Sequence, residues 1–310
     1  MRAIKGIQIE DIVFIDAETT RLHENLEPNT PTFDAWEYKM KRSLEEAGED
    51  IFENYIDKSA LYPEFSRLVC ITVGRVRDGK VTLTTYSDSD EQKMIRMFMD
   101  DLDAVVKHSP KTQICGHSVK NFDIPFIFKR AIVNGVAPNL LMDVAGLKPW
   151  EVTAIDTKEL WKGSGYYNTS LIMLCLALGV ESPKGDITGA EVGNVYFKEG
   201  EKGVERIVKY CERDVFALIN CFRKMRFEEV FDDFEVRVPV ERKPLRLIER
   251  IAENGEISPE DENLIYELSV QLDYKEKEAF IKNLNGALKL KGGKLDEIIE
   301  LTILKGNYTG

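Results

Sequence analysis

The amino-acid sequence predicts an α/β fold in which a mixed β-sheet is flanked by helices. Residues 13–15 belong to a continuous apolar run, which is typical of a strand buried on both faces. Residues 67–86 contain two β-rich segments joined by an Asp-Gly pair at 78–79, which predicts a hairpin. Residues 91–106 carry apolar side chains at helical spacing, and another strand-like segment follows at 112–117.

The first strand ends in two acidic residues, Asp16 and Glu18. Residues two apart on a strand point to the same side, so these carboxylates are expected to project together. Two carboxylates at the end of a buried strand repel each other unless a cation lies between them, and hard divalent cations prefer oxygen ligands. The alternative interpretation is an ordinary acidic turn after the strand.

Residues 21–63 form a long connection between the first two strands. Segments 34–42 and 51–56 have the composition of helices. A connection of this length is typical of a functional flap, although a packing insert without substrate contact fits the sequence equally well.

The second acidic element is Asn121-Phe122-Asp123, which follows the strand predicted at 112–117. Pro125 is typical of the first turn of a helix and places Asp123 near a helix N-terminus, where an aspartate commonly acts as the N-cap. If the preceding strand lies beside the first strand, Asp123 reaches the same sheet edge as Asp16. The sequence leaves both roles open.

The third acidic element lies on a periodic helix predicted over residues 203–218. Tyr210 and Asp214 are four residues apart and therefore lie on one face of that helix. Apolar residues flank this face, so an inward-pointing carboxylate would need a partner or a metal ion. The alternative is a surface Asp214 paired with Arg213 or Lys209.

The composition of the chain argues against several classes of protein. The chain has 310 residues, 43% hydrophobic and 31% charged, with a net charge of −12, which argues against coating nucleic acid through a broad basic surface. The five cysteines form no CxxC pair, which favours reduced core residues over a zinc site or disulfide framework. The absence of a long apolar segment or a secretory signal predicts a cytoplasmic protein without membrane partners.

The three acidic elements resemble the motifs of the DEDD exonuclease superfamily. The sequence contains Asp16-Ala17-Glu18, Asn121-Phe122-Asp123 and Tyr210-Cys211-Glu212-Arg213-Asp214 in that order. Lys209 stands where the histidine subclass would need its base, so the chain resembles the tyrosine subclass, DEDDy. It is most similar to predicted exonucleases related to the proofreading domain of family-B DNA polymerases. This likeness covers residues 8–230 and implies a ribonuclease-H-like fold.

The resemblance implies hydrolysis of terminal phosphodiester bonds, from the 3′ end, by two divalent ions about 4 Å apart, Mg²⁺ or Mn²⁺. It implies that Asp16 bridges both ions, that Glu18 and Asp214 hold one of them, and that Asp123 serves the other. Tyr210 would orient the attacking water. A free phenol has a pKa near 10, so positioning is a better role for it than strong base catalysis.

The expected substrate is the 3′ end of DNA, single-stranded or frayed, with RNA trimming and a catalytically inactive nucleic-acid-binding accessory module as alternatives. Replication or repair proteins are the expected partners. Phe122 is a candidate for stacking on a terminal base, or for plain core packing. His117 is expected to be a satisfied strand-end residue. The other candidate substrate contacts are Thr19, Asn121, Lys184 and the Tyr166-Tyr167 pair.

The sequence predicts two domains, an exonuclease domain at 1–235, which contains the 21–63 insert, and a helical C-terminal appendage at 236–310. Ser258-Pro259 has the N-cap and first-turn proline of a helix start. No chemistry is visible in the appendage, so a docked helical domain is favoured over a partner-binding segment.

Overall fold

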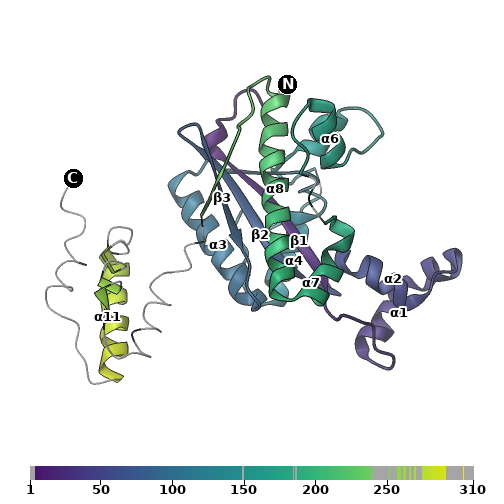
Figure 1. Cartoon of the computed structure of the whole chain (residues 1–310), viewed down its shortest axis with the longest axis horizontal. Coiled ribbons are helices and arrows are strands. Elements are labelled where there is room, and N and C mark those ends of the chain that lie inside the picture. The colour runs from purple at the N-terminus through teal and green to yellow at the C-terminus, as the bar shows by residue number, and fades with distance from the viewer. Residues whose placement is uncertain are drawn as a thin grey trace. The chain divides into compact units, whose positions relative to one another are not determined.

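The computed structural model describes residues 4–239 except 149, 184, 186 and 238, together with 251, 257–259, 261–262, 265–266, 269, 274–290 and 303. The chain divides into two compact units, Met1–Pro239 and Val240–Gly310. The first unit is a mixed β-sheet flanked by helices, which confirms the predicted fold class (Figure 1). Within the described residues, no helix combines the length and apolar character needed to cross a membrane.

Six strands of the described region form one sheet in the order β5-β4-β1-β2-β3-β6. β1, β2 and β3 are antiparallel neighbours, whereas β4 and β5 run parallel to β1 on its other side. An antiparallel hairpin unit followed by parallel strands is the order of ribonuclease-H-like folds. The strands are β1 (Ile12–Arg21), β2 (Ser66–Arg77), β3 (Lys80–Tyr86), β4 (Gln113–Gly116), β5 (Ile155–Asp156) and β6 (Glu235–Arg237).

The predicted hairpin is confirmed between β2 and β3. Asp78 and Gly79 have φ values of 49° and 73°, the left-handed conformation that a type I′ hairpin turn requires at both central positions. Glycine and aspartate tolerate this conformation better than most residues.

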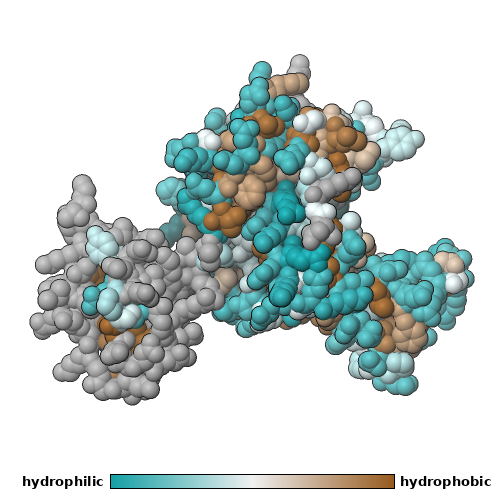
Figure 2. Space-filling model, viewed as in Figure 1, coloured by the Kyte–Doolittle hydropathy of each residue, from teal (hydrophilic) through white to brown (hydrophobic). Residues whose placement is uncertain are grey.

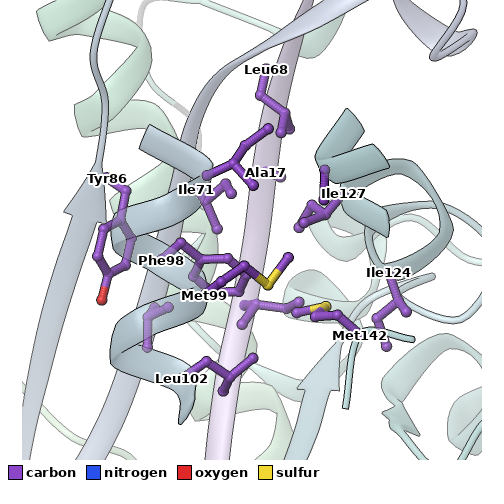
Figure 3. Packing of buried hydrophobic residues seen from close by; sticks show 14 of the residues in the cluster. Ala17, Leu68, Ile71, Tyr86, Phe98, Met99, Leu102, Ile124, Ile127 and Met142 are labelled. Atoms are coloured by element: carbon purple, nitrogen blue, oxygen red, sulfur yellow. The ribbon is translucent and has the colours of Figure 1, made fainter. Parts of the chain in front are cut away.

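Helices α3 (Glu91–His108) and α4 (Asp123–Val133) cover one face of the sheet, which confirms the predicted helix at 91–106. Their apolar residues pack against β1 and β2, where Phe98 and Met99 from α3 and Ile124 and Ile127 from α4 converge on the centre of the sheet (Figure 3). On α3 the buried apolar positions 94–95, 98–99 and 102 recur every three or four residues because only one stripe of the helix faces the sheet.

Helices α8 (Glu201–Met225) and α6 (Leu171–Leu178) contribute to the core on the opposite face. α8 approaches the sheet closely at Gly74, where an added Cβ would lie 2.7 Å from Val215 Cγ1 and 2.8 Å from Ile219 Cδ1. A side chain at position 74 would push the helix outward, so glycine sets the distance between α8 and β2. The shorter helices are η1 (Ile9–Asp11), η2 (Ser59–Leu61), α5 (Thr157–Lys162), η3 (Gly189–Glu191) and α7 (Val192–Glu199).

The insert contains both predicted helices, α1 (Pro31–Ala47) and α2 (Ile51–Lys58). They enclose an aromatic core of their own, in which the Trp36 ring meets Tyr55 edge-on at 5.5 Å and Phe65 at 5.0 Å. The insert extends from the end of β1 (Figure 1) and combines apolar patches with a largely hydrophilic surface (Figure 2).

In the second unit, helix α11 (Tyr274–Leu290) buries Phe280, Leu284 and Leu288, which are spaced four residues apart. Ser258 Oγ accepts a hydrogen bond from the Asp261 backbone amide at 3.2 Å, so the predicted helix start at this serine is confirmed. Most of the helical appendage predicted at 236–310 lies outside the described residues.

Candidate active site

The second acidic element meets the first at the edge where β1 and β4 run parallel. β1 continues to Arg21, so Asp16 and Glu18 lie within the strand and not, as the sequence had predicted, at its end. The pairing with β4 ends at Phe14 and Cys115, so these two acids lie where β1 extends past the end of β4.

The Ala17 backbone amide donates a hydrogen bond to Asp123 Oδ1 at 3.2 Å. Asp123 is only 3% exposed, and the N-cap of α4 is Phe122, without a side-chain cap. The structure therefore directs the Asp123 carboxylate to β1 between Asp16 and Glu18.

Helix α8 brings the third acidic element to the same place. Cys211 Sγ lies 3.3 Å from Asp16 Oδ2, and one ligand atom from each of Asp16, Glu18 and Cys211 lies within 4.8 Å of the others. One turn further along α8, Asp214 lies close enough to Tyr210 for its charge, after burial, to raise the pKa of the phenol. Arg213, the surface partner considered from sequence, instead points its guanidinium toward Gly185.

A register shift between Glu18 and Thr19 interrupts the pairing of β1 with β2. A β-bulge re-aims the side chains beside it and bends the strand. Here it follows the second carboxylate directly, so the strand departs from regular pairing at the point where the acidic residues project.

The four carboxylates disfavour one another's charged forms. Burial raises the pKa of Asp16 to about 6, against a partial lowering by the Cys211 hydrogen bond. Burial and then the negative charge of Asp16 raise the pKa of Asp214 to about 8. The same two causes, in the same order, hold the pKa values of Glu18 and Asp123 well above their usual range. The four carboxylates can therefore be ionised together only if a positive charge lies among them.

Tyr210 shares this environment. Burial, followed by the charges of Asp214, Glu18 and Asp16, raises the pKa of its phenol above the usual range. The side chain therefore remains a neutral phenol at physiological pH, able to donate a hydrogen bond but unsuited to act as a base.

The donor set fits divalent cations. Among the described residues, no salt bridge involves Asp16, Glu18, Asp123 or Asp214. The Asp214 Oδ1 atom is buried without a hydrogen-bond partner in the described region, which is costly unless a ligand satisfies it. Clustered carboxylate oxygens suit Mg²⁺ or Mn²⁺. Burial raises the pKa of the Cys211 thiol well above its usual range, which disfavours a soft thiolate ligand.

The predicted substrate contacts have different surroundings. Thr19 Oγ1 donates to the Ala60 carbonyl at 2.8 Å, so its hydroxyl is already used to hold the insert. Phe122 is half-buried, packs against the core and lies 5.3 Å from the Phe126 ring. Asn121 is exposed in the turn before α4, and Lys184 lies outside the described residues.

The remaining candidate contact is the Tyr166-Tyr167 pair, whereas His117 was expected to be satisfied within the fold. Tyr166 and Tyr167 are 92% and 89% exposed. His117 is satisfied at the end of β4, as predicted, because its Nδ1 lies 3.0 Å from Thr157 Oγ1 and its Nε2 lies 2.8 Å from the Thr169 carbonyl oxygen. Burial also lowers the pKa of His117, so the neutral ring is favoured.

Two residues beside the site were not predicted to take part in it. Cys211 was interpreted as a core residue, and its thiol contact with Asp16 spans 195 positions. Glu212 is 8% exposed and accepts a hydrogen bond from Thr85 Oγ1 at 3.0 Å, which attaches α8 to β3. The only signal in the sequence was their place inside the Tyr-x-x-x-Asp element.

A family model matches the chain. Residues 60–237 match the family described as predicted 3′–5′ exonucleases related to the exonuclease domain of PolB. The match includes Asp123, Tyr210 and Asp214 and begins after Asp16 and Glu18.

Among solved structures, the chain is similar to the family B DNA polymerase from the hyperthermophilic archaeon Pyrobaculum calidifontis. The identity is 14% and the TM-score 0.44, over 86% of this chain and 29% of the polymerase chain, so the chain spans less than a third of that protein's length. A search of the curated proteins finds no match.

Proposed function

The chain belongs to the family of predicted 3′–5′ exonucleases related to the exonuclease domain of PolB, and from this premise we propose that it hydrolyses the terminal phosphodiester bond at the 3′ end of DNA with divalent metal ions. One observation carries the proposal. The acidic elements of β1, α4 and α8, which are far apart in sequence, place their carboxylates in mutual electrostatic contact.

Asp16, Glu18, Asp123 and Asp214 would hold two ions, Mg²⁺ or Mn²⁺. When bound, such ions supply a water activated for attack and stabilise the departing 3′ oxygen. Asp16 is the natural shared ligand, because its charge raises the pKa of each of the other three carboxyl groups. The buried, unsatisfied Asp214 Oδ1 offers a further oxygen from α8.

Groups of the protein would orient the carboxylates and the reacting water or phosphate. The Ala17 amide holds the Asp123 carboxylate toward β1, and the neutral Tyr210 phenol can donate a hydrogen bond to a water or a phosphate oxygen beside Asp214. A positioned donor of this kind accelerates a reaction by fixing the reacting groups and by stabilising charge that develops in the transition state.

Tyr210→Phe is expected to lower kcat about 10- to 100-fold, because a hydrogen bond to a charged group is worth roughly 1.5–3 kcal/mol. Mn²⁺ affinity, measured by calorimetry, should change little because Asp214 and the other carboxylates remain. Tyr196→Phe on α7 is the matched control and should keep the wild-type rate. An unchanged kcat in Tyr210→Phe would remove the phenol from the mechanism.

The function is tested with matched 5′-labelled single-stranded DNA and RNA oligonucleotides in Mg²⁺, Mn²⁺ or EDTA. We expect a ladder on DNA that shortens from the 3′ end and disappears in EDTA. A stronger ladder on RNA would assign the chain to RNA trimming instead. Binding without cleavage of either oligonucleotide, or of duplex and mismatched ends, would favour the catalytically inactive accessory module.

A DNA 3′ end as substrate also leads us to expect replication or repair proteins as partners. Family membership supports this expectation only through the relationship to PolB. Four clustered carboxylates meet no physical need of a module that only binds nucleic acid, which favours the enzyme.

A further inference from the structure

Cys211 makes two contacts with the central carboxylate residue of the site. Its Sγ lies 3.3 Å from Asp16 Oδ2 and 3.5 Å from the Asp16 backbone oxygen. The cysteine is fully buried, so water does not compete for its thiol hydrogen. A thiol is a weak donor, and a carboxylate is the strongest kind of acceptor available to it here.

No described side chain other than that of Cys211 donates a hydrogen bond to the Asp16 carboxylate. An aspartate side chain without such a donor can rotate about χ1 and χ2 between several rotamers. A donor on Oδ2 favours one rotamer and leaves the remaining lone pairs of the carboxylate available to a cation.

The position of Cys211 on α8 is restrained by the hydrogen bond of the next residue, Glu212. Thr85 Oγ1 donates to Glu212 Oε1 at 3.0 Å and also lies 3.0 Å from Thr72 Oγ1. Thr72 is the residue paired with Asp16 across β1 and β2. These contacts connect Asp16 through β2 and β3 to α8, and Cys211 connects α8 directly back to Asp16. Together they restrain the position of the helix relative to β1.

We propose that Cys211 is a positioning residue that holds the Asp16 carboxylate in the orientation needed to bind divalent metal ions. This inference rests on the proposed function of the same site. The role requires a hydrogen bond donated by the Cys211 thiol to the Asp16 carboxylate, and it does not require a bond between sulfur and metal. It predicts that removal of the donor weakens metal binding even when the volume of the side chain is preserved.

The test is calorimetric titration of Mn²⁺ into the full-length wild-type protein and three variants. Cys211→Val keeps the side-chain volume but has no hydrogen-bond donor. Cys211→Ala loses both the volume and the donor, and Cys211→Ser keeps a donor. We expect the Mn²⁺ dissociation constant to rise about tenfold in the valine and alanine variants. The serine variant should stay within about threefold of wild type, because its hydroxyl can still donate to Asp16.

Cys221→Ala is the matched control for packing. Cys221 is a fully buried cysteine on the same helix and contacts Cys175 at 3.5 Å. We expect this variant to lose thermal stability while binding Mn²⁺ like wild type. Equal weakening in Cys221→Ala and Cys211→Val would overturn the proposal, because it would show a general loosening of α8. Wild-type affinity in Cys211→Val would overturn it as well.

Two further outcomes complete the design. A thiolate-to-metal charge-transfer band in the Co²⁺-loaded wild type, lost in Cys211→Ser, would replace the hydrogen-bonding role with direct ligation. Failure of the wild type to bind Mn²⁺ or to cleave any oligonucleotide would refute the proposed function, and with it the premise of this inference. A wild type that binds and cleaves, beside an unaltered Cys211→Val, would refute the positioning role alone.

Discussion

Asp16→Ala is expected to lower kcat for removal of a 3′-terminal nucleotide at least about 1,000-fold, which corresponds to a loss of about 4 kcal/mol of transition-state stabilisation. Asp16 is the carboxylate whose charge acts on Glu18, Asp123 and Asp214. Its removal takes away the ligand that all of them would share, so the loss should exceed that of Tyr210→Phe.

The fold of this variant should be preserved, because the alanine relieves repulsion and leaves the β1 backbone pairing in place. Rates are measured on 5′-labelled single-stranded DNA with Mn²⁺, and folding by circular dichroism and thermal melting in EDTA. Asp11→Ala is the matched control. Asp11 precedes the same strand, its carboxylate accepts only a hydrogen bond from Ser109 among the described residues, and its loss should leave kcat unchanged. Wild-type cleavage by Asp16→Ala would exclude Asp16 from catalysis.

The metal-free protein should become less stable as the pH rises, and metal should reverse this loss. The pKa of Asp214 in the folded state is raised from 3.8 to about 8, so the folded state keeps a proton that the unfolded state has already released. Stability is therefore greatest at low pH and is lost as the pH rises toward 8. Between pH 6.5 and 8.5 this group alone should cost about 2 kcal/mol.

This prediction is checked by urea unfolding in EDTA at pH 6.5 and 8.5 for wild type and Asp214→Asn. The difference between the two proteins cancels the contributions of titrating groups that do not interact with Asp214. We expect wild type to lose stability relative to the variant across this interval. Mn²⁺ should stabilise wild type more at pH 8.5 than at pH 6.5, because protons compete with the metal. A pH-independent difference, or no stabilisation by metal, would contradict the carboxylate cluster as a cation site.

The elements predicted from sequence depended on local signals. The apolar run before Asp16, the Asp-Gly turn and the helical periodicity of residues 91–106 each arise within a few turns or strand positions, and each element is present in the structure. The spacing of Tyr210 and Asp214 on α8 likewise follows from 3.6 residues per helical turn. Residue types and spacing were therefore sufficient to name the fold class and the candidate acids.

Contacts between distant segments could not be predicted in this way. A common edge for the acidic elements was expected, but the amide of Ala17 on Asp123 Oδ1, a separation of 106 positions, was not. Nor did local pattern distinguish an N-cap from an inward-facing Asp123. Thr19 was a candidate substrate contact from the sequence, and the packing of the insert assigns its hydroxyl to the Ala60 carbonyl.

From local signals the sequence predicted β1 to β4, helices α1 to α4 and α8, and the candidate acids and tyrosine, because hydrophobic periodicity and turn chemistry act over short range. The short strands β5 and β6 and helices α5 to α7 were not predicted. Tertiary structure alone decided that Cys211 and Glu212 join the site and that the carboxylates share one electrostatic environment. The reason is that hydrogen bonds and charge repulsion depend on distances in space, and those distances are set by the packing of α8 on the sheet.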